Sequence, residues 1–391
     1  AHMTGPSGEK WNFGDSDSAG ADEFVPNFAG LAALQRRYFR KHGATTGDVN
    51  ALLSRVVNPS IPSLCNHAGC ALTLLDWSAN GTFAELDARL PTCVSYRLVD
   101  SGWNSSVALG TWRSDWRGVG GNNDTTTTSG IAALAHPTYL AFKGGNGEAN
   151  HNDADAGSWI LEMGGARWAV DLGADSYGLP NYFSKSPAHG HRYSYYRKST
   201  RGHNTLTFGG HDKEPGWSSQ DVTRVAPITS FTCPAVGKSI SLPHATMDLT
   251  PVYANAGGPS PPTPKTSSVQ RGFAMASWSH LVIVDEWTSP GSGNVTWSMH
   301  FESKHIEATV ASDGLSVILA SNTTGTGTGV GAKLRVALDS PANAGKFQVV
   351  TPAITPPQRA VATLRKIILI VRDPAAVTKI QISLTDANVV R

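Results

Sequence analysis

The sequence predicts a mainly β protein: an antiparallel β-sandwich preceded by a short helical segment. From Cys93 onward, apolar residues alternate with polar ones in short runs separated by Gly, Pro, Asn and Asp, as in antiparallel strands joined by hairpins. The composition is 40% hydrophobic and only 16% charged, with 40 Gly and 23 Pro, which suits a loop-rich β protein better than a helical bundle. We therefore divide the chain into a helical segment, residues 1–92, and a sandwich, residues 93–391.

Three stretches predict the helical segment. Residues 26–43 space their apolar side chains three and four apart and end at a glycine, which is the pattern of an amphipathic helix. A second helix is expected over residues 48–57, where small polar residues precede an apolar stripe, and a third over residues 70–77. These are too few helices to close a bundle by themselves. We expect them to be the end of a helical domain whose earlier part lies outside this chain.

The strand pattern recurs along the rest of the chain. Alternating runs occupy residues 93–99, 106–113, 138–144, 158–164, 167–173, 204–210, 273–287, 295–303, 332–338 and 363–372. Residues 255–268 and 321–331 are rich in turn-forming residues and are flanked by such runs, so we interpret them as exposed loops of the sandwich and not as domain linkers.

Charge and hydropathy exclude two classes of partner. The formal net charge is +2, so no overall positive field would recruit nucleic acid. The chain has no apolar run of about 18 residues and no charged-then-apolar leader, so the sequence predicts neither a membrane span nor a signal peptide. An acidic ligand would have to be held by a local cluster.

Glycosylation motifs and cysteines bear on the compartment. The N-x-S/T motifs lie at Asn80, Asn104, Asn123, Asn294 and Asn322. Composition alone would give roughly three or four, so the small excess favours a secreted glycoprotein. The cysteines are Cys65, Cys70, Cys93 and Cys233, with no C-x-x-C pair. A zinc knuckle is therefore not expected, and one or two disulfides stay open.

Residues 144–177 gather metal-binding groups around two expected strands. Asp153 stands just before the first strand and Asp171 ends the second. Because the start of one hairpin strand lies beside the end of the next, the two carboxylates are expected to lie close together, where they repel unless a cation or proton intervenes. His203 stands directly ahead of another strand. Two aspartates and a histidine that leave an open position suit Zn²⁺.

Less specific interpretations of the same residues stay open. Asp153 could cap the turn into its strand, and Asp155 and Gly157 are interpreted as turn formers. Asp171 and His203 could be a buried hydrogen-bonded pair without a metal. A calcium loop fits less well, because the EF-hand spacing fails and no helices flank it.

A basic and aromatic stretch follows at residues 189–203, with four Arg or Lys, three His and three Tyr. Such a cluster could pair with the carboxylates or sulfates of an acidic polysaccharide and stack sugar faces on its rings. The candidate substrate-binding residues are Arg113, Arg192, Tyr195, Arg197 and Arg201. The alternatives are an ordinary solvated face and, since Tyr195 and Tyr196 alternate faces in an extended segment, at least one ring packed in the core.

Five ordered blocks resemble the heparinase II/III-like family of polysaccharide lyases. They are "RSDW" (113–116), "AFKGG" (141–145), "NHNDADAGSWIL" (150–161), "RWAVDLGADSYGLPNYF" (167–183) and "YYRKSTRGHNTL" (195–206), and "WNFGDSD" (11–17) resembles the approach to that domain. The resemblance implies an N-terminal (α/α) toroid, of which the helical segment would be the end, and a C-terminal antiparallel β-sandwich. The active site would lie in the cleft between the two.

The resemblance also implies roles for single residues. Asp171 and His203 match zinc positions in the sandwich, and His151 matches a histidine that lines the cleft, with Asn150 beside it. The family often has a second histidine where this chain has Asp153, so a more oxygen-rich site or a different ion is an open alternative.

These residues predict a lyase that cleaves a uronic-acid polysaccharide by metal-supported β-elimination. The reaction needs the C6 carboxylate neutralised, a base at C5 and an acid at the leaving O4. Asn150 and His151 could donate to the carboxylate, and His151 could instead be the base. Tyr182, Tyr195 and Tyr196 are candidate proton carriers, although a phenol needs a nearby cation to act as a base.

Two other functions stay open. The family's catalytic tyrosine and its helper residue lie upstream of the block at residues 11–17, so an upstream toroid segment or a second chain is expected to complete the site. Without one, the chain would be an acidic-glycan-binding module. A uronate C5-epimerase would use the same proton abstraction without cleaving O4. The sequence does not choose among alginate, glucuronan and glycosaminoglycan.

Overall fold

The structure is a computed structural model, and it describes residues 12–14, 93–100, 105–114, 136–148, 151–184, 191–209, 220–232, 242–254, 268–288, 293–322 and 331–389. The three expected helices lie outside these residues, as do Asn150 and most of the two expected loops. The division between residues 92 and 93 therefore stays a prediction. Among the described residues, no helix is long and apolar enough to span a membrane.

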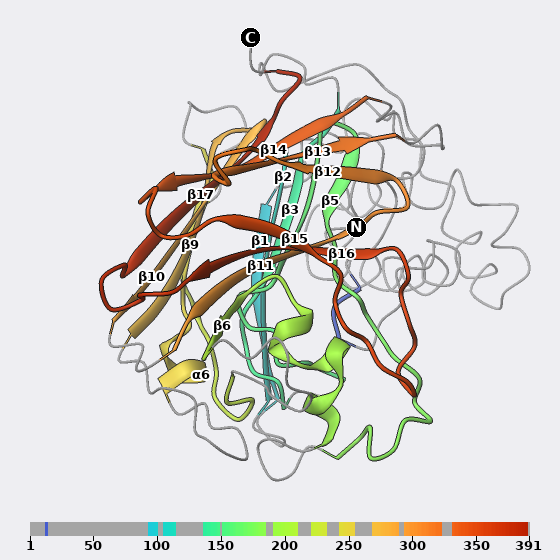
Figure 1. The fold of residues 1–391 in the computed structure, drawn as a ribbon. Helices are drawn as coiled ribbons and strands as arrows, with labels where there is room; N and C mark the ends of the chain where they lie inside the picture. Colours follow the sequence, from blue (N-terminus) through green and yellow to red (C-terminus); the bar gives the residue numbers. More distant parts are fainter. Residues whose placement is uncertain are drawn as a thin grey trace, which may run out of the picture.

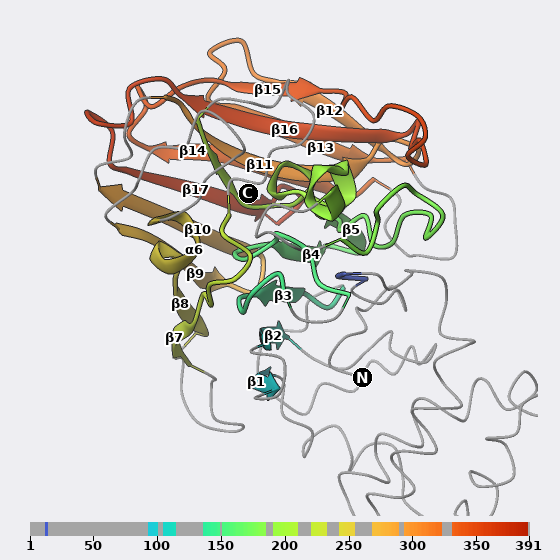
Figure 2. The ribbon, with the colours of Figure 1, turned by 90° about the horizontal axis from the view of Figure 1, so that it is seen from below.

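The described chain is mostly antiparallel sheet, as the alternation predicts, with a single short α-helix, α6 (Thr250–Ala254), among the described residues. A five-stranded sheet has the order β1-β2-β3-β4-β5. Its strands are β1 (Cys93–Asp100), β2 (Ser105–Arg113), β3 (Tyr139–Lys143), β4 (Trp159–Met163) and β5 (Ala166–Ala169). Each neighbouring pair is antiparallel, so this sheet is a meander in chain order (Figure 2).

A second sheet of eight strands has the order β12-β13-β14-β17-β10-β9-β8-β7, and a third of four strands has the order β15-β16-β11-β6. The eight strands are β7 (Ile228–Phe231), β8 (His244–Asp248), β9 (Ser268–Ser277), β10 (His280–Thr288), β12 (Ile306–Val310), β13 (Ser316–Ser321), β14 (Lys333–Ser340) and β17 (Lys379–Asp386). The four are β6 (Leu206–Phe208), β11 (Val295–Glu302), β15 (Phe347–Val350) and β16 (Leu364–Val371).

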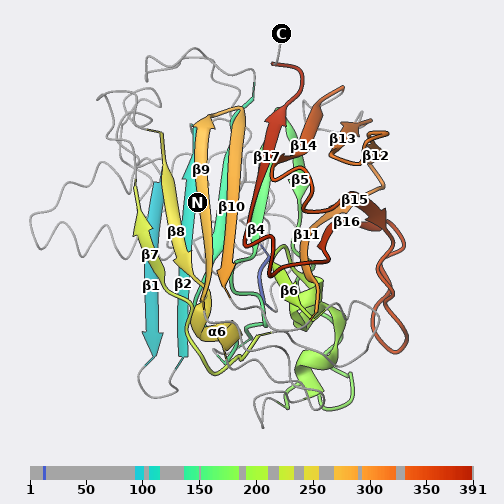
Figure 3. The same cartoon turned by 60° about the vertical axis from the view of Figure 1, so that its left-hand side comes forward.

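The three sheets enclose one hydrophobic core. The five-stranded and four-stranded sheets lie side by side, where the amide of Val170, just after β5, donates to the carbonyl of His300 in β11 at 3.1 Å. The eight-stranded sheet faces them (Figure 3). Across the core Phe142 of β3 stacks on Phe273 of β9, with ring centroids 4.8 Å apart, and such aromatic pairs add about 0.5–1.5 kcal/mol beyond their buried area. The arrangement is a β-sandwich.

The hairpin between β4 and β5 confirms the expected strand, turn, strand arrangement. Its turn is made by Gly164 and Gly165, whose φ angles are 61° and 87°, the left-handed conformation that two-residue hairpin turns require. The hairpin brings the segment before β4 and the segment after β5 to the same end of the sheet. Asp153 and Asp171 lie on these two segments.

A buried ion pair ties the eight-stranded sheet to this end of the molecule. Arg271 of β9 bonds both carboxylate oxygens of Asp285 of β10, at 2.7 and 2.8 Å. Its Nη1 also donates to the carbonyls of Gly157 and Asn204 at 2.8 and 2.9 Å. Those carbonyls belong to the loops that carry Asp155 and His203, so this pair fixes both loops against the sheet.

Candidate functional site

Three loops converge at this end of the sandwich. They are residues 151–158 before β4, residues 170–184 after β5, and residues 191–203 before β6. The third consists of 3-10 turns, η2 (His191–Ser194), η3 (Tyr196–Lys198) and η4 (Thr200–Gly202), drawn in green beside β6 in Figure 1. Because β4 pairs with β5 and β6 pairs with β11 beside β5, all three loops are held by neighbouring strands.

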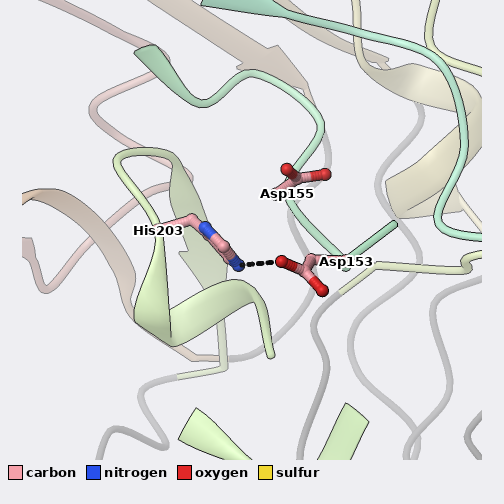
Figure 4. Close-up of side chains that lie close together, drawn as sticks. All are labelled: Asp153, Asp155 and His203. Atoms are coloured by element: carbon pink, nitrogen blue, oxygen red, sulfur yellow. Dashed lines mark ion pairs between the residues drawn. The ribbon is translucent and has the colours of Figure 1, made fainter. Parts of the chain in front are cut away.

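A buried cluster of Asp153, Asp155 and His203 lies where these loops meet (Figure 4). One ligand atom from each residue lies within 4.8 Å of the others. The Nε2 atom of His203 is 3.8 Å from Asp153 Oδ2, and its Nδ1 atom is 3.2 Å from Asp171 Oδ2. The imidazole ring therefore stands between two carboxylates, one at each nitrogen.

Buried cations surround the carboxylates. The ammonium of Lys198 lies 3.1 and 3.2 Å from the two oxygens of Asp153, and Arg192 Nη2 lies 3.3 Å from the same carboxylate. Lys143 of β3 forms a short ion pair with Asp155. Since a buried carboxylate is costly unless it is paired, these cations offset part of the cost of burying the two aspartates.

The environment shifts the pKa values of Asp153, Asp171 and His203. Burial raises the pKa of Asp153, in spite of the charges of Lys198, His203 and Arg192. Burial also acts to raise the pKa of Asp171, but the charge and hydrogen bond of His203 outweigh it and leave that pKa lowered. For His203, burial acts to lower the pKa, but Asp171 outweighs it and the pKa is raised. Asp171 and His203 therefore favour an ion pair.

Two buried atoms of the cluster have no hydrogen-bond partner, His203 Nε2 and Asp155 Oδ2. Buried polar atoms in native proteins are nearly always paired or bound to a ligand. An imidazole nitrogen and two carboxylates are also a donor set for a divalent metal ion. The cluster could thus hold such an ion, and Asp171 on Nδ1 would orient the ring as a carboxylate behind a metal-bound histidine does.

This arrangement changes the expected ligand set. Asp153 and His203 come together as predicted, and Asp155, which sequence reasoning assigned to a turn, lies with them. Asp155 does both, since its carbonyl accepts the Ser158 amide at 2.9 Å while its carboxylate faces the cluster. Asp171 stands on the other ring nitrogen, and its direct binding to a metal stays a prediction.

His151 is exposed and has a left-handed backbone, with φ of 62°. Such a conformation is uncommon outside glycine and is found disproportionately at functional sites. The hydroxyl of Tyr177 lies 3.2 Å from His151 Nδ1, and the two rings stack with centroids 6.2 Å apart. His151 is therefore a candidate for chemistry at the surface of the site.

The other predicted catalytic residues of the described chain are buried. Tyr182 is 1% exposed, and its ring centroid lies 4.8 Å from the guanidinium of Arg192. Tyr196 is also buried, with its hydroxyl 2.8 Å from His300 Nε2. Their roles as proton carriers stay predictions, which the burial does not favour. Tyr195 is half-buried and donates its hydroxyl to the carbonyl of Pro180.

The structure corrects the expectation of an exposed basic cluster. The side chains of Arg113, Arg192, Arg197 and Arg201 are 1%, 0%, 4% and 7% exposed. Arg197 Nη1 donates to the carbonyls of Leu172 and Ala174 at 2.5 and 3.3 Å, and Arg192 Nε donates to the carbonyl of Asn152 at 3.1 Å. The loops have no sheet ladder to satisfy their carbonyls, so these cations do so. Sugar binding by the four arginines stays a prediction that their burial does not favour.

A second buried network adjoins His203 and was not anticipated. Asn204 Oδ1 accepts the backbone amide of His300 at 2.7 Å and lies 3.0 Å from its Nδ1, and the Asn204 amide donates to the carbonyls of Trp159 and Val170 at 2.7 and 2.9 Å. Burial, with the charges of Lys366 and His203, holds the pKa of His300 well below its ordinary value. The network thus joins β4, the residue after β5 and β11 through a neutral histidine.

Comparisons with known proteins support this architecture. The family model "Heparinase II/III-like, C-terminal" matches residues 127–347, more than half of the chain. A heparan sulfate lyase HepC mutant from Pedobacter heparinus is similar in structure, with a TM-score of 0.55 and 15% identity over 98% of this chain and 45% of that chain. A heparinase III, the BT4657 gene product, has a TM-score of 0.55 and 12% identity over 98% of this chain and 44% of that chain.

At these identities the structural likeness shows the fold alone. This chain spans less than half the length of both solved structures. A search of curated proteins found no match.

Proposed function

Because the chain belongs to the heparinase II/III-like family, we propose that it is a polysaccharide lyase that cleaves a uronic-acid-containing polysaccharide by β-elimination. The single observation that carries the proposal in this chain is His151, an exposed histidine with a left-handed backbone beside the buried carboxylate cluster. An imidazole can accept and return a proton near neutral pH. That capacity is what abstraction of the C5 proton requires.

Roles for individual residues follow from the contacts. The Tyr177 hydroxyl lies beside His151 Nδ1. With the ring hydrogen on Nδ1 and donated to the hydroxyl oxygen, Nε2 carries the lone pair, and we assign Nε2 as the atom that takes the C5 proton. Lys198 joins the loop that carries Asp153 to the one that carries Gly173, because its ammonium contacts the carboxylate of the first and donates to the carbonyl of the second at 3.2 Å. These contacts hold the loops around His151 in one arrangement, which is the positioning that makes a bound group an efficient base.

We further propose that Asp153, Asp155 and His203 hold Zn²⁺ or another divalent ion. When bound, the ion would neutralise the carboxylates and fix the loops. The donor atoms without hydrogen-bond partners support this assignment. Asp171 would hold the imidazole from Nδ1.

The lyase proposal is tested by the ultraviolet absorbance of unsaturated uronate product. The protein, together with the upstream segment or second chain that completes its site, is incubated with alginate, polyglucuronate, heparan sulfate and dermatan sulfate in turn. A rise on one polymer is expected, with a loss of about 100-fold or more in His151→Ala, since general bases contribute about 10²–10⁴-fold. His191→Ala is the matched control, because His191 is an exposed histidine on η2. Flat traces on all four polymers would contradict the proposal.

A binding module is the second candidate, and one observation favours it. Among the described members of the predicted catalytic set, His151 is exposed whereas Tyr182 and Tyr196 are buried. Under the lyase proposal, an upstream toroid segment or a second chain would supply the remaining acid. Retention on immobilised acidic polysaccharide without unsaturated product would favour the binding module. Secretion to a compartment that holds such polymers is part of both proposals.

A further inference from the structure

Exposed aromatic side chains gather beside His151. Among the described residues, the large hydrophobic side chains that stay exposed are Tyr177 at 50%, Phe183 at 55% and Val389 at 55%. Two of these three lie on one loop, and Tyr177 contacts His151. The third, Val389, lies far from this loop in the sequence, near the C-terminus. Exposed aromatic rings grouped at one place mark an interaction site more often than scattered ones do.

The rings form an ordered cluster. Tyr177 and Phe183 meet edge to face, with centroids 5.0 Å apart. The buried ring of Tyr182 supports both, with centroids 5.4 Å from Tyr177 and 5.2 Å from Phe183. The cations of Arg192 and Lys198 lie 4.8 and 5.9 Å from the centroid of Tyr182. The exposed rings are thus joined through Tyr182 to the residues that pair with Asp153.

The loop that carries the rings is held by consecutive turns. The amides of Leu179 and Tyr182 donate to the carbonyls of Ser176 and Leu179, each at 3.1 Å, and the amide of Ser184 donates to that of Asn181 at 2.9 Å. The side chain of Leu179 is buried, and the Tyr195 hydroxyl is bonded to the Pro180 carbonyl. The exposed rings are therefore presented by a built surface, and a preorganised surface loses less entropy when it binds.

We propose that Tyr177 and Phe183 form a stacking subsite for a sugar ring of the acidic polysaccharide, next to the residue that His151 acts on, and that the Tyr177 hydroxyl positions His151. This inference rests on the proposed function and adds where the polymer is held. A pyranose presents an apolar face of C–H groups and a polar rim of hydroxyls, and an aromatic face is the matching surface.

Size and chemistry favour a sugar over a protein partner. A specific protein interface buries about 1,600 Å² in total, far more than two side chains supply. One sugar unit covers about the area of one or two rings. A polymer that stacks here would carry its neighbouring unit past His151, since the rings of Tyr177 and His151 stack on one another.

Tyr177 has two separable roles in this inference. Its ring would stack on sugar, and its hydroxyl fixes His151 through Nδ1 at 3.2 Å. Tyr177→Phe keeps the ring and removes the hydroxyl. We expect this variant to bind polysaccharide like the wild type and, where product forms, to lose kcat with little change in KM and a shifted pH profile. Tyr177→Ala should lose both binding and turnover.

The experiment is affinity electrophoresis through gels that contain polyglucuronate, alginate or heparan sulfate, which measures binding without turnover. On the polymer that retards the wild type most, Phe183→Ala and Tyr177→Ala are expected to weaken binding about tenfold, and Phe183→Trp to retain it. Val389→Ala is the matched control, because Val389 is as exposed as Phe183 and should bind unchanged. Thermal denaturation of each variant checks its fold.

The subsite is overturned if Phe183→Ala and Tyr177→Ala bind like the wild type, or if the wild type binds none of the polymers. The two proposals fail separately. Weakened retention with no unsaturated product from any polymer keeps the subsite and removes the lyase. Product formation with an unchanged KM in Phe183→Ala keeps the lyase and removes the subsite.

Discussion

The eight-stranded sheet and the three loops of the site bury charge in different ways. In the sheet, Arg271 and Asp285 are joined by two hydrogen bonds, and Nη1 of the arginine donates to two carbonyls. In the loops, Lys198 and Arg192 pair with Asp153, and Lys143 pairs with Asp155. Two atoms of the cluster, His203 Nε2 and Asp155 Oδ2, have no hydrogen-bond partner. The first arrangement is complete without a ligand, whereas the second has donor atoms that could take one. This difference can be tested by breaking each arrangement in turn.

Breaking the pair of Arg271 and Asp285 should have the largest effect on stability. Arg271→Ala leaves Asp285 buried and unpaired and removes the ties to the loops at Gly157 and Asn204. The expected cost is about 3–5 kcal/mol in the free energy of unfolding, measured by chemical denaturation. Lys379→Ala is the control: it breaks an ion pair with Glu286 whose side chains are 56% and 51% exposed, which should cost about 1 kcal/mol or less. Equal losses in the two variants would contradict the comparison.

Substitutions in the Asp153, Asp155 and His203 cluster test whether it binds a metal ion. Elemental analysis of protein purified without chelator is expected to find about one equivalent of a divalent ion. His203→Ala should lose it, and Asp171→Asn should bind about 10–100-fold more weakly, as changes behind a metal ligand do. Asp221→Asn is a control, since that carboxylate lies outside the cluster. A metal-free wild type that takes up none from a zinc buffer would show that the cations alone complete the cluster.

A smaller effect is expected on how the free energy of unfolding depends on pH, through His300. Its pKa in the folded protein is held well below the ordinary value of 6.5 by burial and by Lys366 and His203. Above about pH 6.5 the histidine is neutral in both states, so its stabilising contribution is fully present. As the pH falls below that value, the unfolded chain gains a proton that the folded chain does not bind. Stability is then lost, by at most about 1.4 kcal/mol per pH unit.

Denaturation at pH 7.5 and at pH 5.5 should therefore show a steeper loss for the wild type than for His300→Gln. The comparison between variants matters, because the raised pKa of His203 acts in the opposite direction. Its contribution is present at low pH and lost as the pH rises through the folded value. Parallel losses in the two proteins would mean that His300 is protonated or solvated in the folded state.

Much of the fold could be predicted from the sequence. Each run expected from alternation contains a strand, and the hairpin at Gly164 and Gly165 is as expected. Six strands were not anticipated: β7, β8, β12, β13, β15 and β17. Strands such as β7 and β8 are only four and five residues long and lie at or next to the sheet edge, so their pairing depends on neighbours that a local pattern does not contain.

The site was predicted less completely. Asp153 and His203 could be found because each stands beside an expected strand. Asp155 was assigned to a turn because its backbone does form one, and a sequence does not show which way the carboxylate of a turn residue faces. The burial of Arg192 and Arg197 was missed for a related reason. Counting cations in a stretch says nothing about the carbonyls and carboxylates of distant loops that satisfy them.

The contacts of residues 12–14 connect the N-terminal part of the described chain to two loops of the site. Asn12 donates to the carbonyl of Asp171 at 3.2 Å, and the carbonyl of Gly14 accepts from Lys198 at 3.0 Å. A Cβ at Gly14 would come within 2.5 Å of the carbonyl oxygen of His151. Asn12 and Gly14 thus pack against the loops of the site. A pull on Asn12 or Gly14 would therefore be transmitted to Asp171 and Lys198, through the hydrogen bonds that join them.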